Sequence, residues 1–242
     1  MLLATLGAAL VAGLARGFSG FGAALIFMPL GAALLGPRLA AAVLLLADNL
    51  STLPLLPGAW RRANRREVGA MAAGTLVGTP LGAAILLHLD PTALRWGLSG
   101  LVVAMLALLA SGWRHAGQLP APAAAGVGVL SGFCSGAAQM GGPPVVAAWL
   151  GGAIPAERVR ANIVLFFALS GLVSAVIYLA SGLLGGTAVA VAALVLPAYA
   201  GGVWLGARMF GLASEARFRA ACLILIAFAA LLGLPVWDRL RG

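Results

Sequence analysis

Long runs of apolar residues follow one another along this chain with barely a polar interval between them. Eight such segments can be counted. They cover residues 2–35, 39–58, 68–88, 93–112, 121–150, 161–182, 187–207 and 219–236. A helix rises about 1.5 Å per residue, so roughly 20 apolar residues cross about 30 Å of hydrocarbon. The pattern predicts an all-α polytopic membrane protein with one integrated membrane domain and no soluble domain.

The first and fifth segments are interrupted by glycine-rich sequence. Residues 17–22 read GFSGFG inside a run that is too long for one straight crossing, and residues 132–144 read GFCSGAAQMGGPP. Glycine and proline release backbone N–H and C=O groups from the helix, and lipid cannot satisfy them. We expect both interruptions to break a helix and to line a cavity or pack on protein.

The two halves of the chain also resemble each other. GFSGFG at 17–22 matches GFCSGA at 132–137, and the spacing of Gly78 and Gly82 matches that of Gly202 and Gly206. Duplication of a four-segment unit is the simplest account, with repeats at 1–118 and 119–242, and shared low complexity is the alternative. Paired repeats with broken segments at matching positions are typical of a transporter's binding site.

The arginines favour an inverted arrangement of these repeats. If the first segment of each half is re-entrant, ten of the fourteen loop arginines share the face of Arg61, with Arg16 left out as intramembrane. If all eight segments cross, the same arginines divide seven against seven. Positive charge gathers in cytoplasmic loops, so the bias favours inverted repeats with re-entrant first segments. Only the C-terminal stretch 238–241 fits the alternative better.

The net positive charge of the chain does not indicate a nucleic-acid-binding protein. All 15 basic residues are arginines, against 6 acidic residues, a balance that would suit nucleic acid. The arginines stand singly or in short clusters between apolar runs, with no basic face carrying interleaved aromatics. We therefore expect the lipid bilayer, and no nucleic acid, as the partner of this surface. The first 17 residues lack a basic stretch before the apolar run, which argues against a cleaved signal peptide.

Cysteine and histidine are too sparse for metal chemistry. Cys134 and Cys222 both fall inside apolar runs, and His88 and His115 lie far from either cysteine. A metal site needs clustered thiolates or imidazoles. We expect no disulfide framework, no metal site and no cofactor.

At the two glycine motifs the sequence resembles the TauE/SafE family, the sulfite exporter-like membrane permeases. GFSGFGAALIFMPL at 17–30 is similar to the family's opening motif, and GFCSGAAQMGGPP at 132–144 is its echo in the second half. The resemblance extends along essentially the whole chain. It implies a permease of the bacterial inner membrane that moves sulfite, thiosulfate, sulfonates or related organic anions, coupled to protons. The second motif departs from the pattern at 137–139, which leaves the exact substrate open.

The two motifs also supply what an anion needs, because N-termini of half-helices carry unpaired N–H groups and a partial positive charge. Arg16 adds a guanidinium that suits an oxyanion, unless it snorkels to the surface. The predicted substrate-binding residues are Arg16, Gly17, Ser19, Gly20, Gly22, Gly132, Cys134, Ser135, Gly136, Gln139, Gly141 and Gly142. The alternative is that these glycines only allow close helix packing. We expect that packing role of Gly78, Gly82, Gly202 and Gly206.

Asp48 is the only carboxylate well inside an apolar run, and Asn49 follows it. Charged groups at such depth are costly and usually functional. We predict that Asp48 takes up and releases a proton during transport, with Asn49 beside it. Permanent pairing with Arg16 and a purely structural hydrogen-bonding role are the alternatives.

Two other functions stay open. Cys134 stands in the second break, where a helix N-terminus would make a thiol reactive, so the chain could be a membrane-embedded thiol protein that relays sulfur. It could also be a non-catalytic membrane subunit of a larger transport complex. The permease hypothesis predicts no enzymatic activity, and whether the chain forms a homo-oligomer stays open.

Overall fold

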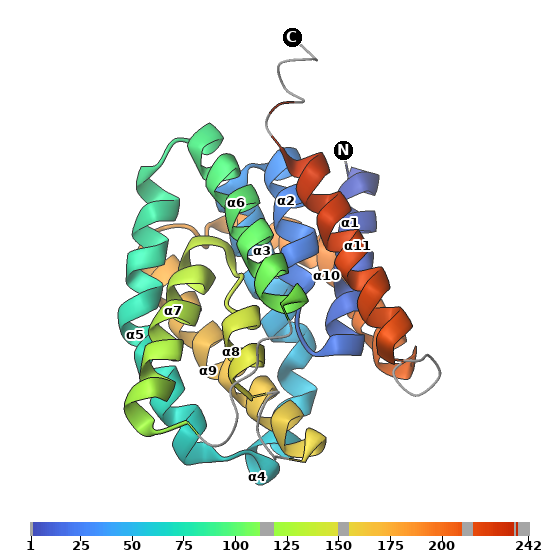
Figure 1. Ribbon diagram of the computed structural model, residues 1–242. Coiled ribbons are helices and arrows are strands. Elements are labelled where there is room, and N and C mark those ends of the chain that lie inside the picture. Colours follow the sequence, from blue (N-terminus) through green and yellow to red (C-terminus); the bar gives the residue numbers. More distant parts are fainter. Residues whose placement is uncertain (1, 112–118, 150–154, 210–214, 235, 237–242) are drawn as a thin grey trace.

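The computed structural model describes residues 2–111, 119–149, 155–209, 215–234 and 236, without the side chains of residues 19, 156 and 215–223. Helices make up almost all of the described chain (Figure 1). In chain order they are α1 (Leu2–Ser19), α2 (Ala23–Leu35), α3 (Pro37–Thr52), a 3-10 turn (Leu53–Leu55), α4 (Leu56–Arg62), α5 (Arg65–His88), α6 (Pro91–Ala110), α7 (Ala121–Ala138), α8 (Gly142–Trp149), α9 (Ala156–Ala180), α10 (Gly186–Met209) and α11 (Glu215–Gly233).

Length and composition identify the protein as a membrane protein. Within the described residues, six helical stretches are long and apolar enough to cross a bilayer. These are 37–62, 65–88, 91–110, 121–138, 157–180 and 186–209. The prediction of an all-α polytopic membrane protein is confirmed.

Each predicted interruption contains a helix break, but the breaks are shorter than expected, because residues 17–19 remain in α1 and residues 132–138 remain in α7. Between α1 and α2 the backbone turns at Gly20 and Gly22, whose φ angles of 77° and 94° lie in the left-handed region that glycine tolerates. Between α7 and α8 the same conformation falls on Gln139, with φ 56°. The two helices on either side of each break pack against each other. The chain therefore folds back at both breaks instead of continuing across.

Two helix pairs form the most intimate contacts of the fold: α5 with α7, and α1 with α10. A Cβ added at Gly78 would fall on the backbone of Val129, and one added at Gly206 would fall on the backbone of Leu14. Backbones approach this closely only where small residues repeat along both helices. The same holds at Gly82 and Gly202, so the packing role expected of these four glycines is confirmed.

Contacts between helix ends show which segments share a face of the molecule. At one face Arg62, at the end of α4, pairs with Glu157 near the start of α9, and the backbone N–H of Asn64 donates to Asn162 Oδ1 at 2.7 Å. Re-entrant broken segments put the α4–α5 turn and the start of α9 on one face. Eight full crossings would put them on opposite faces.

At the other face, arginine side chains cap the C-terminal ends of helices. Arg38, at the start of α3, donates to the carbonyl oxygens of Leu86 and Leu87 at 3.0 and 2.6 Å. Arg95 of α6 donates to the carbonyl of Gly233 at 3.2 Å. These bonds satisfy carbonyl groups that have no partner within their own helix.

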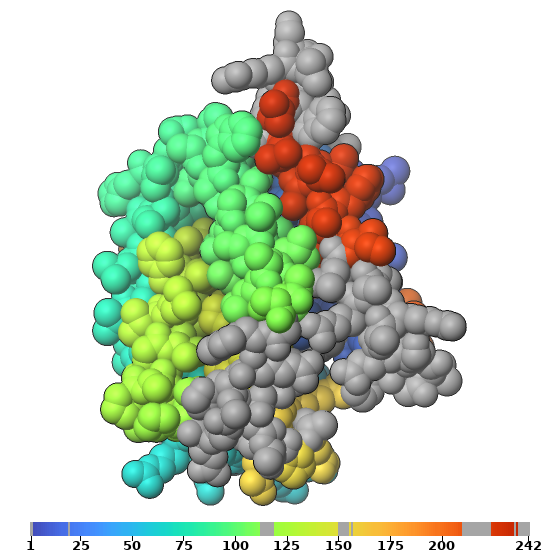
Figure 2. Space-filling model, viewed as in Figure 1, coloured from blue at the N-terminus to red at the C-terminus, as the bar shows by residue number. Residues whose placement is uncertain are grey.

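Lipid-facing side chains cover the outside. On the face shown in Figure 2, the side chains of α5, α6 and α7 form a continuous surface. Large apolar residues are exposed on each of these helices, among them Leu76, Val103 and Leu130. In water such an apolar surface would be a site of association with other proteins, whereas in a bilayer it contacts the lipid chains.

Candidate functional site

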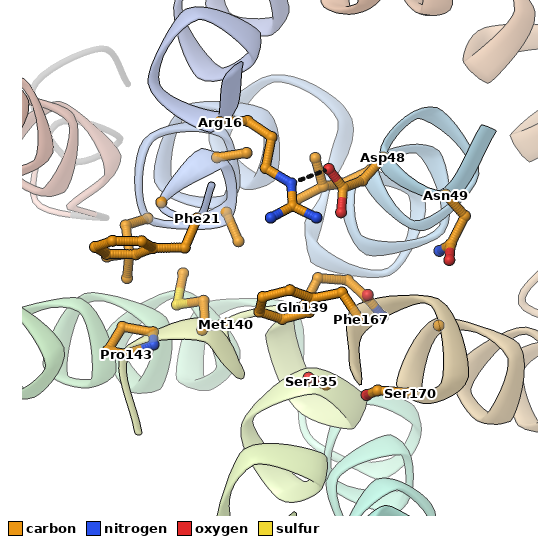
Figure 3. Close-up of a pocket in the computed structure, with 17 residues that line it drawn as sticks. Arg16, Phe21, Asp48, Asn49, Ser135, Gln139, Met140, Pro143, Phe167 and Ser170 are labelled. Atoms are coloured by element: carbon orange, nitrogen blue, oxygen red, sulfur yellow. Dashed lines mark hydrogen bonds and ion pairs between the residues drawn. The ribbon is translucent and has the colours of Figure 1, made fainter. Parts of the chain in front are cut away.

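A cavity of about 40 Å³ lies where the two broken segments meet. Its walls come from α1, the start of α2, α3, the break between α7 and α8, and α9 (Figure 3). One water molecule needs roughly 10–15 Å³ by this measure. The cavity therefore has room for a ligand of a few heavy atoms.

Arg16, in the last turn of α1, is the only cation that lines this cavity among the described residues. Its side chain is 5% exposed and its Nε donates to Oδ1 of Asp48, on α3, at 2.7 Å. A second guanidinium nitrogen, Nη1, donates to the carbonyl of Gly20 in the first break. The ring of Phe167, on α9, lies 4.8 Å from the guanidinium carbon and adds a cation–π contact.

Asp48 accepts hydrogen bonds from two helices that are far apart in the sequence, α1 and α10. Its Oδ1 accepts the Arg16 bond and also accepts the hydroxyl of Tyr199, on α10, at 2.6 Å. Its side chain is 23% exposed and lines the cavity. The ion pair therefore stands at the wall of the cavity, with the carboxylate still partly accessible.

The Arg16 guanidinium keeps one unused nitrogen. Nη2 is buried and has no hydrogen-bond partner among the described atoms. A buried donor without an acceptor costs about 1–3 kcal/mol, and more when it is charged. Beside it, Ala23 and Ala24 of α2 also line the cavity, and no side chain caps that helix. Unpaired N–H groups at a helix N-terminus bind anions readily.

The second break contributes side chains where the first contributes backbone. The α8 helix begins Gly142-Pro143-Pro144, and proline has no N–H to offer. Ser135, Gln139 and, from α9, Ser170 line the cavity instead. The Gln139 Nε2 is buried and without a partner in the described chain. The symmetric pair of backbone donor sets expected from the sequence is thus replaced by amides on one side and polar side chains on the other.

Asn49 lies where α3 crosses α9. Its Nδ2 donates to the carbonyl of Leu45 at 2.7 Å, and a Cβ added at Gly171 of α9 would fall on its side-chain amide. Both Asn49 and Gly171 line the cavity. Glycine at 171 therefore lets the Asn49 side chain lie against α9.

The cavity brings together about half of the residues predicted as a site. Those that line it are Arg16, Gly22, Asp48, Asn49, Ser135, Gln139 and Gly142.

The other predicted residues are not among those that line the cavity. Gly17 packs on the backbone of Val203, and Gly132 and Gly136 pack on Thr75 and Thr79 of α5. The remaining two glycines, Gly20 and Gly141, accept hydrogen bonds at their carbonyls, from Arg16 and from Ser131 Oγ respectively. The side chain of Ser19 lies outside the described residues.

Cys134 is also separate from the cavity. Its side chain is 1% exposed and packs in the apolar core. A thiol that relays sulfur must be reached by its substrate and must form thiolate, and an apolar surrounding disfavours both. Cys222 has no described side chain.

Tyr199 and Phe167 are the residues in contact with the Arg16–Asp48 pair that sequence reasoning missed. The hydrogen bond between Tyr199 and Asp48 joins residues 151 positions apart, and Phe167 is one of several phenylalanines within apolar runs. The one available signal was that a tyrosine in the middle of an apolar segment needs a partner for its hydroxyl.

Comparison with known families assigns the chain to one of them. The family model described as Sulfite exporter TauE/SafE matches residues 5–232. The chain belongs to this family. The match covers nearly the whole chain, so the resemblance of the two glycine motifs is confirmed. No curated protein and no solved structure matches the chain. Membership of the TauE/SafE family supports a role as a membrane transporter.

Proposed function

We propose that this TauE/SafE protein is a permease for a small sulfur-containing anion, such as sulfite, thiosulfate or a simple sulfonate, in the bacterial inner membrane. The observation that carries the proposal is the unpaired Nη2 of buried Arg16 beside the uncapped start of α2. Gln139 adds a second unpaired donor on the same cavity. Three donor groups around a space of this size suit an oxyanion with several acceptor oxygens.

Apolar groups complete the site. Phe21, Met140 and Phe167 line the cavity together with the polar side chains (Figure 3). They lower the polarity of the surroundings of the ion pair, which strengthens the electrostatic attraction for an anion. They also suit the sulfur atom or the short apolar part of a sulfonate.

Asp48 is the proposed coupling group, with Asn49 beside it. It is paired with Arg16 in this conformation, and a proton on its carboxylate would weaken that pair and free the guanidinium for the substrate. Proton uptake and anion binding would then favour each other. The expected consequence is that a proton gradient drives transport.

Two inverted repeats, 1–118 and 119–242, are the proposed framework of the permease. The contact pattern supports them, because α1 and α7 open the halves and each packs along the third long helix of the other half, α10 and α5 respectively. Paired broken helices that face each other near the midplane are the arrangement expected of such transporters.

Flux through proteoliposomes tests the proposal. The purified protein should move labelled sulfite, thiosulfate or methanesulfonate faster when a pH gradient is imposed, and Arg16→Gln should abolish this flux because it removes the cation that holds the anion. The matched control is Arg62→Gln, since Arg62 is 62% exposed and its ion pair lies at the surface. We expect that exposed pair to matter little.

The same assay separates the alternatives. Cys134→Ser should retain flux, whereas a thiol relay through Cys134 would lose it. An absence of flux for all three anions in correctly inserted protein, with no anion binding to the purified chain, would exclude the permease proposal and leave a role as a passive subunit.

A further inference from the structure

The Asp48 carboxylate already pairs with the same guanidinium that the proposed anion would bind. It accepts two short hydrogen bonds on Oδ1, from Arg16 Nε and from the Tyr199 hydroxyl. It lines the same cavity as the unpaired Arg16 Nη2. The Arg16 guanidinium therefore has two possible acceptors, the Asp48 carboxylate and the proposed anion.

The charges of the side chains that line the cavity balance each other. Of the described residues that line it, Arg16 and Asp48 are the only charged ones. Among the described residues, the Tyr199 hydroxyl on α10 bonds to Asp48, and the groups that share the cavity with it from α2, from the break between α7 and α8 and from α9 are uncharged. Tyr199 is the only other titratable group among them.

A monoanion added to this neutral site leaves one negative charge without a counterpart. Burying an unpaired charge is expensive, and the usual response of a protein is to neutralise a group. One proton on Asp48 restores neutrality: the carboxylate becomes a carboxylic acid, and the guanidinium turns its hydrogen bonds to the anion. A dianion would leave one negative charge even after that proton is taken up.

We propose that Asp48 is a built-in competitor for the anion at Arg16, so that the site takes one monoanion together with one proton and rejects dianions. This inference rests on the proposed anion-permease function. It adds the charge of the substrate, which favours hydrogensulfite and sulfonates and excludes thiosulfate, a dianion. It also adds the uptake of one proton with each anion, and it assigns Tyr199 as the positioning residue that holds the carboxylate on Arg16.

Calorimetric titration of the purified full chain with methanesulfonate tests the proposal, because that anion keeps a single charge at every pH used. The wild-type affinity should fall by up to about tenfold per pH unit as pH rises, the slope for one linked proton. Asp48→Asn should remove the competitor, so its affinity should be independent of pH and should match the wild type at low pH. Sulfate, a dianion, should bind at least about tenfold more weakly than methanesulfonate.

Tyr199→Phe provides an independent measurement in case Asp48→Asn does not fold. Loss of the hydroxyl removes a bond that favours the ionised carboxylate, so the fall in affinity should begin at a higher pH than in the wild type. Glu157→Gln is the matched control, since it removes a carboxylate from an ion pair in which that side chain is 71% exposed. Its affinity profile should equal that of the wild type.

The outcomes separate the two levels of the proposal. Methanesulfonate binding that keeps its pH slope in Asp48→Asn, or a wild-type profile in Tyr199→Phe, overturns the competitor role and leaves the permease standing. Sulfate binding as tight as methanesulfonate overturns the charge selection. Absence of any anion binding in the wild type, together with absence of flux, overturns the proposed function itself.

Discussion

A buried arginine is unusual at membrane depth, and the surroundings of Arg16 show how this one is tolerated. Its charge is met by Asp48, its Nη1 by the Gly20 carbonyl and one face of its plane by the Phe167 ring. Each of these contacts offsets part of the cost of removing the guanidinium from water. Nη2 is the one guanidinium nitrogen that has no hydrogen-bond partner within the described part of the chain.

Gln139 is the residue at which backbone conformation and binding can be separated by mutation. It adopts φ 56°, and non-glycine residues pay about 1–2 kcal/mol in the left-handed region. We expect Gln139→Gly to leave the free energy of unfolding unchanged or slightly raised. Anion affinity should fall at least about tenfold, because one hydrogen bond to a charged ligand contributes about 1.5–3 kcal/mol. Thermal unfolding and anion titration of the same sample measure both quantities.

Gln139→Asn is the control for this experiment. It keeps an amide, and asparagine tolerates the left-handed region better than most residues, so its affinity should lie between those of the wild type and Gln139→Gly. Equal affinity in all three proteins would mean that the Gln139 amide does not touch the ligand.

At this scale the sequence could reveal residues but not their partners. Arg16, Asp48 and Gln139 were predictable because a polar residue inside an apolar run is visible without a structure. Tyr199 was not, since nothing in one sequence pairs it with a carboxylate 151 positions away. The hydroxyls of Ser135 and Ser170 became neighbours only through the crossing of separate helices.

At the scale of helices, glycine determines which elements approach most closely. Along α5 and α7 a glycine stands at every fourth position, at Gly74, Gly78 and Gly82 on one helix and at Gly128, Gly132 and Gly136 on the other. Each lies against the backbone of the partner helix. Without a hydrophobic effect between helices in lipid, such close packing is what holds the pair together.

Replacing one of these glycines by alanine should separate the pair. In Gly78→Ala the new Cβ meets the Val129 backbone, which cannot yield as a flexible side chain would, and overpacking typically costs about 1–3 kcal/mol. Denaturant unfolding of the protein in detergent should show this loss. Gly100→Ala on α6 is the matched control, because no atom of the described chain lies within 4 Å of the added Cβ.

A stability of Gly100→Ala equal to or above that of the wild type is expected, since alanine favours helix over glycine by about 1 kcal/mol. If Gly78→Ala were equally stable, the close contact between α5 and α7 would not be a determinant of the fold.

The overlap of two glycine patterns explains what sequence reasoning could not resolve here. Gly17 and Gly132 belong to the broken motifs and also to the four-residue spacing of the packed helix pairs. The sequence alone does not show whether such a glycine breaks a helix or allows two helices to pack closely, because both roles require the absence of a side chain. The breaks themselves were predictable, since residues 17–22 and 132–144 combine glycine or proline with polar side chains inside an apolar run. Their exact extent was not, because residues 17–19 and 132–138 stay helical.

For the whole molecule, the two closely packed pairs each combine a helix from both halves of the chain. The cavity lies between them, with Arg16 on the α1–α10 side and Ser135 on the α5–α7 side. Relative movement of the two pairs would open the cavity without disturbing the glycine contacts inside either one. The arginine distribution along the sequence predicted that the α4–α5 turn and the start of α9 share a face, and the Arg62–Glu157 contact supports this. Charge is excluded from lipid irrespective of the details of packing.

Cross-linking tests the arrangement of these loops across the membrane. In a protein whose own cysteines have been replaced, Arg62→Cys combined with Glu157→Cys should be joined by a short bis-thiol reagent, because the two side chains form an ion pair at one face. Both positions should also react with an impermeant thiol reagent added from the same side. Thr92→Cys, at the start of α6, should react from the opposite side and should not be linked to Arg62→Cys.

Eight full crossings would separate residues 62 and 157 by about 30 Å of hydrocarbon. Labelling of these two positions from opposite sides, with no cross-link, would therefore rule out re-entrant first segments. The side reached together with Arg62 should be the cytoplasmic one, since the loops carrying Arg61, Arg62, Arg65 and Arg66 would otherwise place their charge against the positive-inside rule.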